Sequence, residues 1–150
     1  MTVDVEISVS DSVQNDYDLP ETALLTRWAQ AAYLNSIPAV VSILLTDADE
    51  MQQLNRKYRD KDKPTNVLSF PMQLPVEADV LLLGDIVLCV QVIKQEAEQQ
   101  SRPELSHWAH MVVHGMLHLQ GYDHINSDEA EEMERLEISI LDKLGFNNPY

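Results

Sequence analysis

Three histidines in the last third of the chain constrain its fold more than any other feature. They lie in the run His114-Gly-Met-Leu-His118-Leu-Gln-Gly121-Tyr-Asp-His124. Two histidines four residues apart lie one turn apart on one face of a helix, so both imidazoles can reach a common ion. Gly121 can end that helix in a left-handed conformation, and the segment after it can return His124 to the same point. The spacing therefore predicts a metal site held by His114, His118 and His124.

A site of this kind has a characteristic chemistry. Three neutral imidazoles at about 2.0–2.1 Å leave the fourth position of a tetrahedral ion free, which is typical of catalytic rather than structural zinc. The first hypothesis is therefore a metal-activated water on one zinc ion per chain. Nickel and cobalt are alternative occupants, because the affinity order alone does not decide which metal a three-histidine site holds in a cell.

All five histidines of the chain fall between residues 107 and 124, so the choice of three needs an argument. His110, His114 and His118 also repeat every four residues, but the outer pair spans about 12 Å of helix, too far for one ion. The pair His114 and His118 is favoured because it lies nearest the turn. His107 and His110 are expected to be packed, or to contact the ligands without binding the ion.

The length of 150 residues predicts one domain, residues 1–150, with a core of its own. The first residues alternate polar and apolar side chains and show no basic and apolar leader. No apolar run approaches the ~20 residues that a bilayer requires. The single cysteine, Cys89, lies in an apolar run and is expected to be buried and inert. These features predict a cytoplasmic protein that does not enter a membrane.

Changes in hydrophobic period predict four strands and five helices. The strands are expected near residues 3–9, 40–45, 66–70 and 81–90, the third bounded by Pro64 and Pro71. The helices are expected over residues 20–32, over 49–58 after a Thr46/Asp49 capping pair, over 91–100, from Pro103 through the histidines, and over 127–145. Trp28 and Trp108 fall in helices and are expected in the core. This order predicts a compact α+β domain, with a small mixed sheet packed against helices and the metal-bearing helix in the C-terminal third.

The charges are unevenly distributed. A net charge of −15 argues against nonspecific nucleic-acid binding, and no DNA partner is expected. Five of the ten basic residues nevertheless fall within residues 56–63, directly before Pro64-Thr-Asn-Val-Leu-Ser-Phe-Pro71. This segment is either a phosphate-binding loop beside the metal or a helix end whose cations favour the helix dipole. The acidic run from Asp123 to Asp142 is expected to be the solvated face of an amphipathic helix.

Two carboxylates have open roles. Asp85, beside Gly84, is expected at a strand bulge with a solvated side chain, and the alternative is that it lines a cleft or orients a ligand. Asp123 is either a partner of a histidine N–H or an ordinary turn residue.

Two segments, residues 59–71 and 114–124, together resemble the YbeY family of bacterial endoribonucleases, the rRNA maturation factors. Leu83-Gly84-Asp85-Ile86 and the segment from Trp108 to His114 extend the resemblance over essentially the whole chain. Asn66 stands where members often carry Asp, so this position is not treated as a catalytic carboxylate.

The resemblance implies a compact α+β fold, a zinc ion on His114, His118 and His124, and an important arginine at Arg59. It implies a zinc-dependent endoribonuclease that prefers single strands and acts on ribosomal RNA or ribosomal particles. Maturation of the small-subunit rRNA 3′ end and a part in ribosome quality control are implied as well, with ribosomal or assembly proteins as further partners.

Phosphodiester hydrolysis needs a nucleophile at neutral pH and stabilisation of negative charge on the phosphate. Zinc lowers the pKa of a bound water towards about 7, and Arg59 offers a fork of donors that fits a phosphate. We therefore predict that His114 and Arg59 act in catalysis, that Arg59 holds the scissile phosphate and that Lys61 guides the strand.

Two alternatives remain. Metzincin proteases share the spacing His-x-x-x-His-x-x-Gly-x-x-His, but they carry a glutamate base directly after the first histidine, where this chain has Gly115. The second alternative is a ribosome-assembly factor without catalytic activity, in which zinc stabilises the fold and the basic loop binds RNA or a ribosomal protein.

Overall fold

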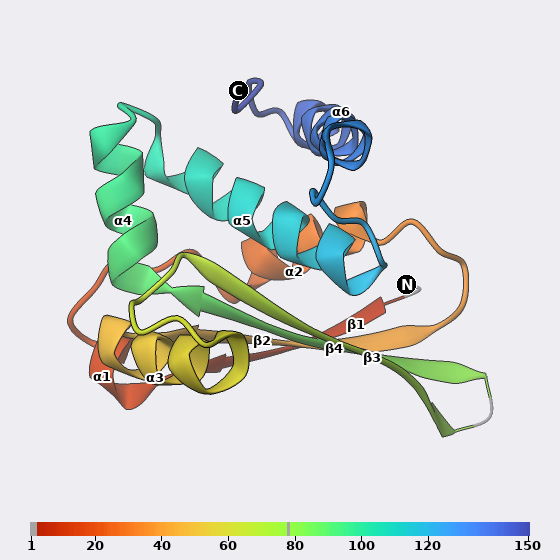
Figure 1. Ribbon diagram of the computed structural model, residues 1–150, viewed down its shortest axis with the longest axis horizontal. Helices are drawn as coiled ribbons and strands as arrows, with labels where there is room; N and C mark the ends of the chain where they lie inside the picture. Colours follow the sequence, from red (N-terminus) through yellow and green to blue (C-terminus); the bar gives the residue numbers. More distant parts are fainter. Residues whose placement is uncertain (1–2, 78) are drawn as a thin grey trace.

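A four-stranded sheet in the order β1-β2-β4-β3 organises the fold (Figure 1). In this computed structural model, which describes residues 3–77 and 79–150, the strands are β1 (Val3–Val9), β2 (Ala39–Thr46), β3 (Val67–Glu77) and β4 (Val80–Cys89). The first three strands in this order are parallel, and β3 is antiparallel to β4 at one edge. The sheet is therefore mixed, as the sequence predicts.

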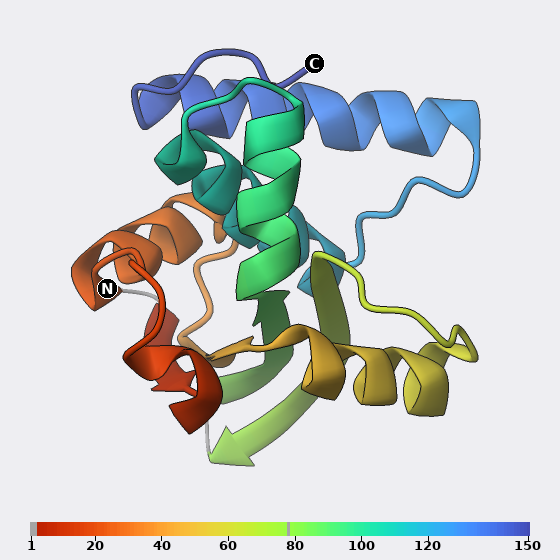
Figure 2. The ribbon, with the colours of Figure 1, turned by 90° about the vertical axis from the view of Figure 1, so that its left-hand side faces the viewer.

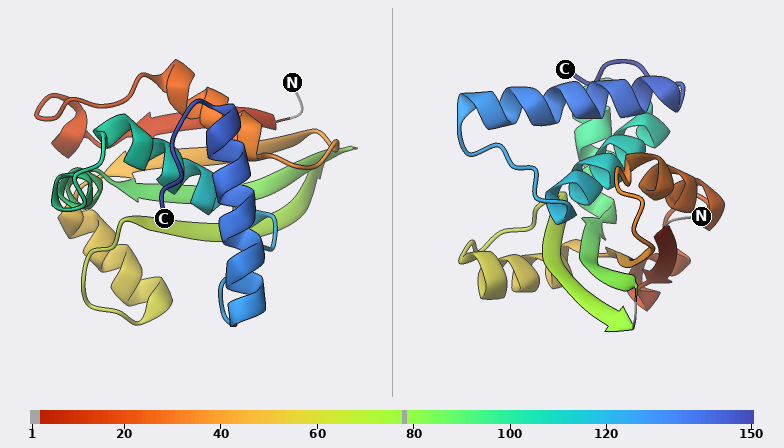
Figure 3. Two further views of the ribbon diagram at one scale, coloured as in Figure 1. Left: turned by 90° about the horizontal axis from the view of Figure 1, so that it is seen from above. Right: turned by 90° about the vertical axis from the view of Figure 1, so that its right-hand side faces the viewer.

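The described residues form six helices: α1 (Asp11–Gln14), α2 (Thr22–Ala32), α3 (Ala48–Arg59), α4 (Val90–Gln99), α5 (Glu104–Leu119) and α6 (Ser127–Lys143). Helices α2 and α5 cover one face of the sheet, and α3 lies on the other face (Figures 1 and 2). Helix α6 crosses α5 on the side away from the sheet (Figure 3). The one helix that the sequence analysis did not predict, α1, has a single turn, too short to show a helical period.

The main core lies between the sheet and helices α2 and α5. Strand β2 alternates as a half-covered strand should, with Ala39, Val41, Ile43 and Leu45 buried towards this core. Trp28 and Trp108 are both buried in it, as predicted. Because α5 has the sheet on one side and α6 on the other, it is buried around most of its circumference, which explains its apolar sequence.

A smaller apolar cluster lies beneath α3 on the opposite face. Its buried members are Met51, Leu68, Val87 and Cys89. The predicted burial of Cys89 is therefore confirmed, and burial raises the pKa of its thiol.

Strand β3 is longer than predicted. The expectation that Pro71 ends it is wrong, because the strand continues to Glu77. Proline is tolerated on an edge strand, where one side of the backbone has no neighbouring strand, and β3 is such an edge. The pairing with β4 is irregular after Pro71, and Gln73 has a φ of 50°.

Three helix ends differ from the predictions in the capping residue or by two residues. The cap of α3 is Asp47, whose carboxylate accepts the Glu50 N–H at 2.8 Å, while the Thr46 hydroxyl bonds to the Glu50 side chain instead. Helix α2 begins at Thr22 and α6 ends at Lys143, each two residues inside the predicted bounds. Among residues 3–77 and 79–150, no helix is long and apolar enough to cross a membrane.

Candidate active site

The end of α5 forms the turn that the sequence predicts. Gly121 has a φ of 97°, in the region that glycine adopts without a steric penalty. Its N–H donates to the His118 carbonyl at 3.0 Å, and the Tyr122 N–H donates to the Leu117 carbonyl at 3.1 Å. These two bonds form a Schellman motif, which ends the helix and reverses the chain.

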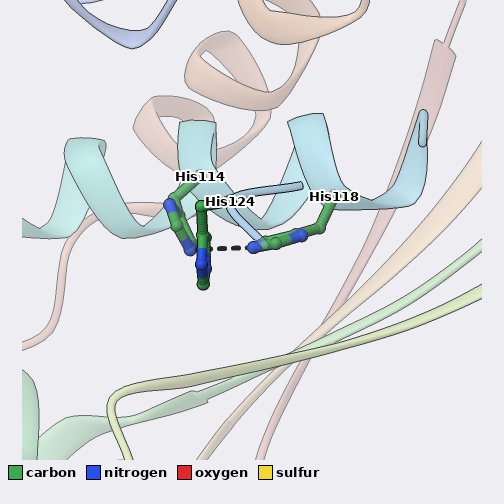
Figure 4. Close-up of side chains that lie close together, drawn as sticks. All are labelled: His114, His118 and His124. Atoms are coloured by element: carbon green, nitrogen blue, oxygen red, sulfur yellow. Dashed lines mark hydrogen bonds between the residues drawn. The ribbon is translucent and has the colours of Figure 1, made fainter. Parts of the chain in front are cut away.

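This reversal places His124 beside the two histidines of the helix (Figure 4). The Nε2 atoms of His114 and His118 lie 3.1 Å apart, and the His124 ring centroid lies 5.6 Å from that of His114 and 5.1 Å from that of His118. One ring nitrogen from each residue lies within 4.8 Å of the others. Nitrogens at 2.0–2.1 Å from a tetrahedral ion are about 3.3 Å apart, so the three side chains fit one divalent ion after small adjustments.

The environment of His118 suits a metal ligand. Burial, followed by the neighbouring His114 and His124, lowers the pKa of His118 to about 4. The imidazole is therefore neutral at pH 7 and keeps a lone pair for an ion. The Asp123 carboxylate lies 3.9 Å from His118 Nδ1, and it also accepts the His124 N–H at 2.8 Å. Asp123 thus orders the turn and lies within ion-pair distance of a candidate ligand.

A buried carboxylate behind His114 was missed by the sequence analysis. Glu137 of α6 is only 1% exposed, and its Oε2 atom lies 2.9 Å from His110 Nε2 and 3.1 Å from His114 Nδ1. Burial alone would raise the pKa of Glu137, but the hydrogen bonds from the two histidines hold it at about 2. Glu137 is therefore an exception to the prediction that the acidic residues of this helix are solvated. It lies on the buried face of α6, four residues after Met133 and three before Ile140. That helical spacing was the signal in the sequence that could have identified it.

The other two histidines are packed, as expected. His107 is 3% exposed, and its Nε2 lies 2.9 Å from the Glu96 carboxylate. His110 contacts the same carboxylate as His114. The Asn66 amide donates to Glu96 at 3.1 Å, so an aspartate at this position would bring two carboxylates together. The asparagine is therefore matched to its surroundings in this chain.

The histidines open onto a cavity of about 560 Å³ between the turn after α5, strand β3 and the end of α3. Its wall consists of Arg59, Thr65, Asn66, Val67, Leu68, Ser69, Pro71, His114, His118, Gly121, Tyr122, Asp123 and His124. Arg59, the last residue of α3, donates from Nη2 to the Ser69 carbonyl at 2.8 Å, and its guanidinium lies 5.1 Å from the Phe70 ring centroid. The fold thus brings Arg59 to the same cavity as the three histidines, 55 or more residues later in the chain.

Lys61 has a different position. It is exposed in the loop after α3 and, as far as the described residues show, does not line this cavity. For the basic cluster, the interpretation as a helix end is confirmed, and phosphate binding stays a prediction. Arg56, Lys57 and Arg59 occupy the last turn of α3, where cations favour the helix dipole, and Arg59 also faces the cavity.

Two comparisons with known proteins show the family and the fold. The family model described as endoribonuclease YbeY matches residues 9–145. The chain belongs to the YbeY family. The resemblance drawn from the two sequence segments is therefore confirmed. The solution structure of TM1509 from Thermotoga maritima, described as VT1, a NESGC target protein, has the same fold, with a TM-score of 0.56 and 22% sequence identity. The similarity covers 94% of this chain and 91% of that chain.

The packing of Gly115 separates this YbeY protein from the metzincin arrangement. A Cβ atom at Gly115 would lie 3.1 Å from Ile86 Cγ2 and 3.3 Å from Ser69 Oγ, so α5 packs closely against the sheet here. A glutamate side chain at this position would require Ile86 of β4 and Ser69 of β3 to shift. The position that carries the general base in metzincin proteases is thus a tightly packed glycine in this chain.

Asp85 of the YbeY chain lies away from the histidines. Val40 pairs with Leu82 and Val41 with Gly84, so Leu83 is the extra residue of a bulge, as the sequence suggested. The Asp85 side chain is half-buried and lines a second cavity of about 490 Å³ together with Leu54 and Tyr58 of α3. It therefore follows the alternative of lining a cleft, and the expectation of a solvated side chain is wrong. This cavity lies on the face of the sheet opposite to α5.

Proposed function

We propose that this YbeY protein is a metal-dependent hydrolase, an endoribonuclease that prefers single-stranded RNA and processes ribosomal RNA. The observation that carries the proposal is the shared cavity of Arg59 and the three histidines. A cation held by His114, His118 and His124 and a guanidinium on the wall of the same cavity suit the binding of a phosphodiester. Zinc is the first choice for the ion, with nickel or cobalt as substitutes, because the donors are three imidazoles.

When bound, the ion would supply a nucleophile at neutral pH by lowering the pKa of water. The protein residues have separate tasks. Arg59 is already oriented by its bond to the Ser69 carbonyl and by the Phe70 ring, so its remaining N–H groups can bind a phosphate at little entropic cost. As negative charge grows on the phosphate oxygens, these donors stabilise it.

The charge distribution suggests how the substrate arrives. With a net charge of −15, the whole molecule repels free RNA, whereas the end of α3 and the following loop carry five basic residues within residues 56–63. We propose that this basic segment, Lys61 included, guides a strand to the cavity. Binding then depends on docking to a ribosomal particle, in the cytoplasm, with ribosomal or assembly proteins as further partners. Small-subunit rRNA 3′-end maturation and ribosome quality control are the processes that such docking would serve.

The decisive experiment is cleavage of a small-subunit rRNA 3′ precursor presented on ribosomal particles. Wild-type protein of known metal content, His114→Ala and Arg59→Ala would be compared, with Arg135→Ala as an arginine control on the exposed side of α6. We expect the first two variants to lose cleavage while remaining folded and bound to particles, and the control to cut normally. Equal cutting by all four proteins would reveal a contaminating nuclease. Particle binding without cutting by any of them would favour the assembly factor.

A further inference from the structure

Glu137 contacts a candidate ligand from outside the cavity. Its carboxylate reaches from α6 to α5 and receives three polar contacts, because the Tyr150 hydroxyl donates to Oε1 at 2.6 Å while His110 and His114 approach Oε2. The side chain is 1% exposed, so water does not compete for these contacts. A carboxylate oxygen accepts hydrogen bonds, so a ring nitrogen at hydrogen-bond distance from it presents a hydrogen.

This requirement determines which nitrogen of His114 carries the proton. Nδ1 lies 3.1 Å from Glu137 Oε2 and therefore carries the hydrogen. In a neutral imidazole the other nitrogen then has the lone pair. That nitrogen, Nε2, is the one that lies 3.1 Å from His118 Nε2 and faces the site of the triad (Figure 4).

We propose that Glu137 is a positioning residue of the metal site, which fixes the tautomer and ring orientation of His114 so that Nε2 faces the ion. This inference rests on the proposed metal binding by the triad. A carboxylate on the far nitrogen also makes a histidine a stronger ligand, and its buried negative charge favours a cation close by. The role needs no contact between Glu137 and the substrate.

A second set of side chains lies close enough together to hold a metal ion by itself: His110, His114 and Glu137. Their separations are those of N–H···O hydrogen bonds, and Tyr150 occupies the second carboxylate oxygen. We therefore assign these contacts to hydrogen bonds that support one ion in the outer triad. A stoichiometry of two ions per chain would overturn this assignment.

The first test measures the affinity for Zn²⁺ and Co²⁺ by competition with a chelating dye. Glu137→Met keeps the side-chain volume and removes both acceptors, whereas Glu137→Gln keeps one acceptor and removes the charge. We expect about 10–100-fold weaker binding for Glu137→Met, an intermediate loss for Glu137→Gln, and an altered visible spectrum of bound Co²⁺ in both. Glu96→Met is the matched control, because Glu96 contacts His107 at 2.9 Å, the separation between Glu137 and His110, but His107 belongs to neither metal group. It should bind both ions as the wild type does.

Wild-type affinity and spectrum in folded Glu137→Met would overturn the positioning role while leaving the proposed function intact. Absence of metal binding by the wild-type protein would overturn both. If Glu137→Met does not fold, nitrogen-15 NMR of the zinc-loaded wild-type protein decides the question without a mutation. We expect a proton on His114 Nδ1 and a metal-bound Nε2, and the opposite assignment would refute the proposal.

Discussion

The N–H of Tyr122 donates to the carbonyl oxygen of Leu117 at 3.1 Å, and this bond closes the turn that carries His124 back to the helix. The candidate metal site thus depends on backbone geometry as well as on three imidazoles. Gly121, between the two helical histidines and the third, adopts the left-handed conformation that allows this turn.

Replacing Gly121 should therefore weaken the site without changing any ligand. At a φ of 97°, an alanine costs about 1–2 kcal/mol of folding free energy, and relaxation of the turn would displace His124. We expect Gly121→Ala to lower the urea midpoint and to weaken Zn²⁺ binding. Gly145→Ala is the matched control, because Gly145 has a φ of 91° after α6 and, like Gly121, would meet no described atom within 4 Å of a new Cβ. The Gly145→Ala protein should lose a similar amount of stability and keep the Zn²⁺ affinity of the wild type. If Gly145→Ala lost affinity as much as Gly121→Ala, general destabilisation would explain the weaker binding of both variants.

Metal removal should lower the thermal stability of the wild-type protein. A ligand at about 100 times its dissociation constant stabilises a native state by about 2.7 kcal/mol, provided that it does not bind the unfolded chain. We expect zinc to raise the Tm of the wild type and a chelator to reverse the change. His118→Ala should show no zinc-dependent shift, whereas His107→Gln should keep it, because His107 is buried against Glu96 and Arg102 away from the triad. A full shift in His118→Ala would exclude His118 as a ligand.

Local signals explain which features the sequence could predict. The His114–His118 spacing, Gly121 and the alternation of residues 3–9, which form β1, each act within a few residues. All three have the predicted structure. Glu137 has the same charge as its solvated neighbours, and only the packing of α6 on α5 makes it a buried partner of His114. Likewise, Pro71 ends a strand in the average case, but the edge position of β3 lets the strand continue.

The close packing of Gly115 gives a prediction about the protease alternative. Gly115→Glu introduces the glutamate of a metzincin site, but its side chain would press on Ile86 and Ser69 and bury a charge. We expect a loss of stability of about 3 kcal/mol or more, measured by urea unfolding, and no peptide hydrolysis. Leu105→Glu serves as the control, because Leu105 is exposed at the start of α5 and should tolerate the same side chain within about 0.5 kcal/mol. A stable Gly115→Glu protein that cleaves peptides would contradict this prediction and favour the protease alternative.

Arg59 and Lys61 should respond differently to substitution, although only Asp60 lies between them. Arg59 lies on the cavity wall, so Arg59→Lys keeps the charge but loses the planar fork and its bond to the Ser69 carbonyl. A hydrogen bond to a charged group contributes about 1.5–3 kcal/mol. We therefore expect Arg59→Lys to lower kcat/KM on particle-bound precursor RNA by about 10–150-fold, mainly through a lower kcat. Lys61→Ala removes an exposed charge outside the wall and should instead raise KM, more strongly at low salt than at high salt. If Arg59→Lys cut at the wild-type rate while Lys61→Ala lost kcat, the phosphate-binding role would belong to the loop rather than to the end of α3.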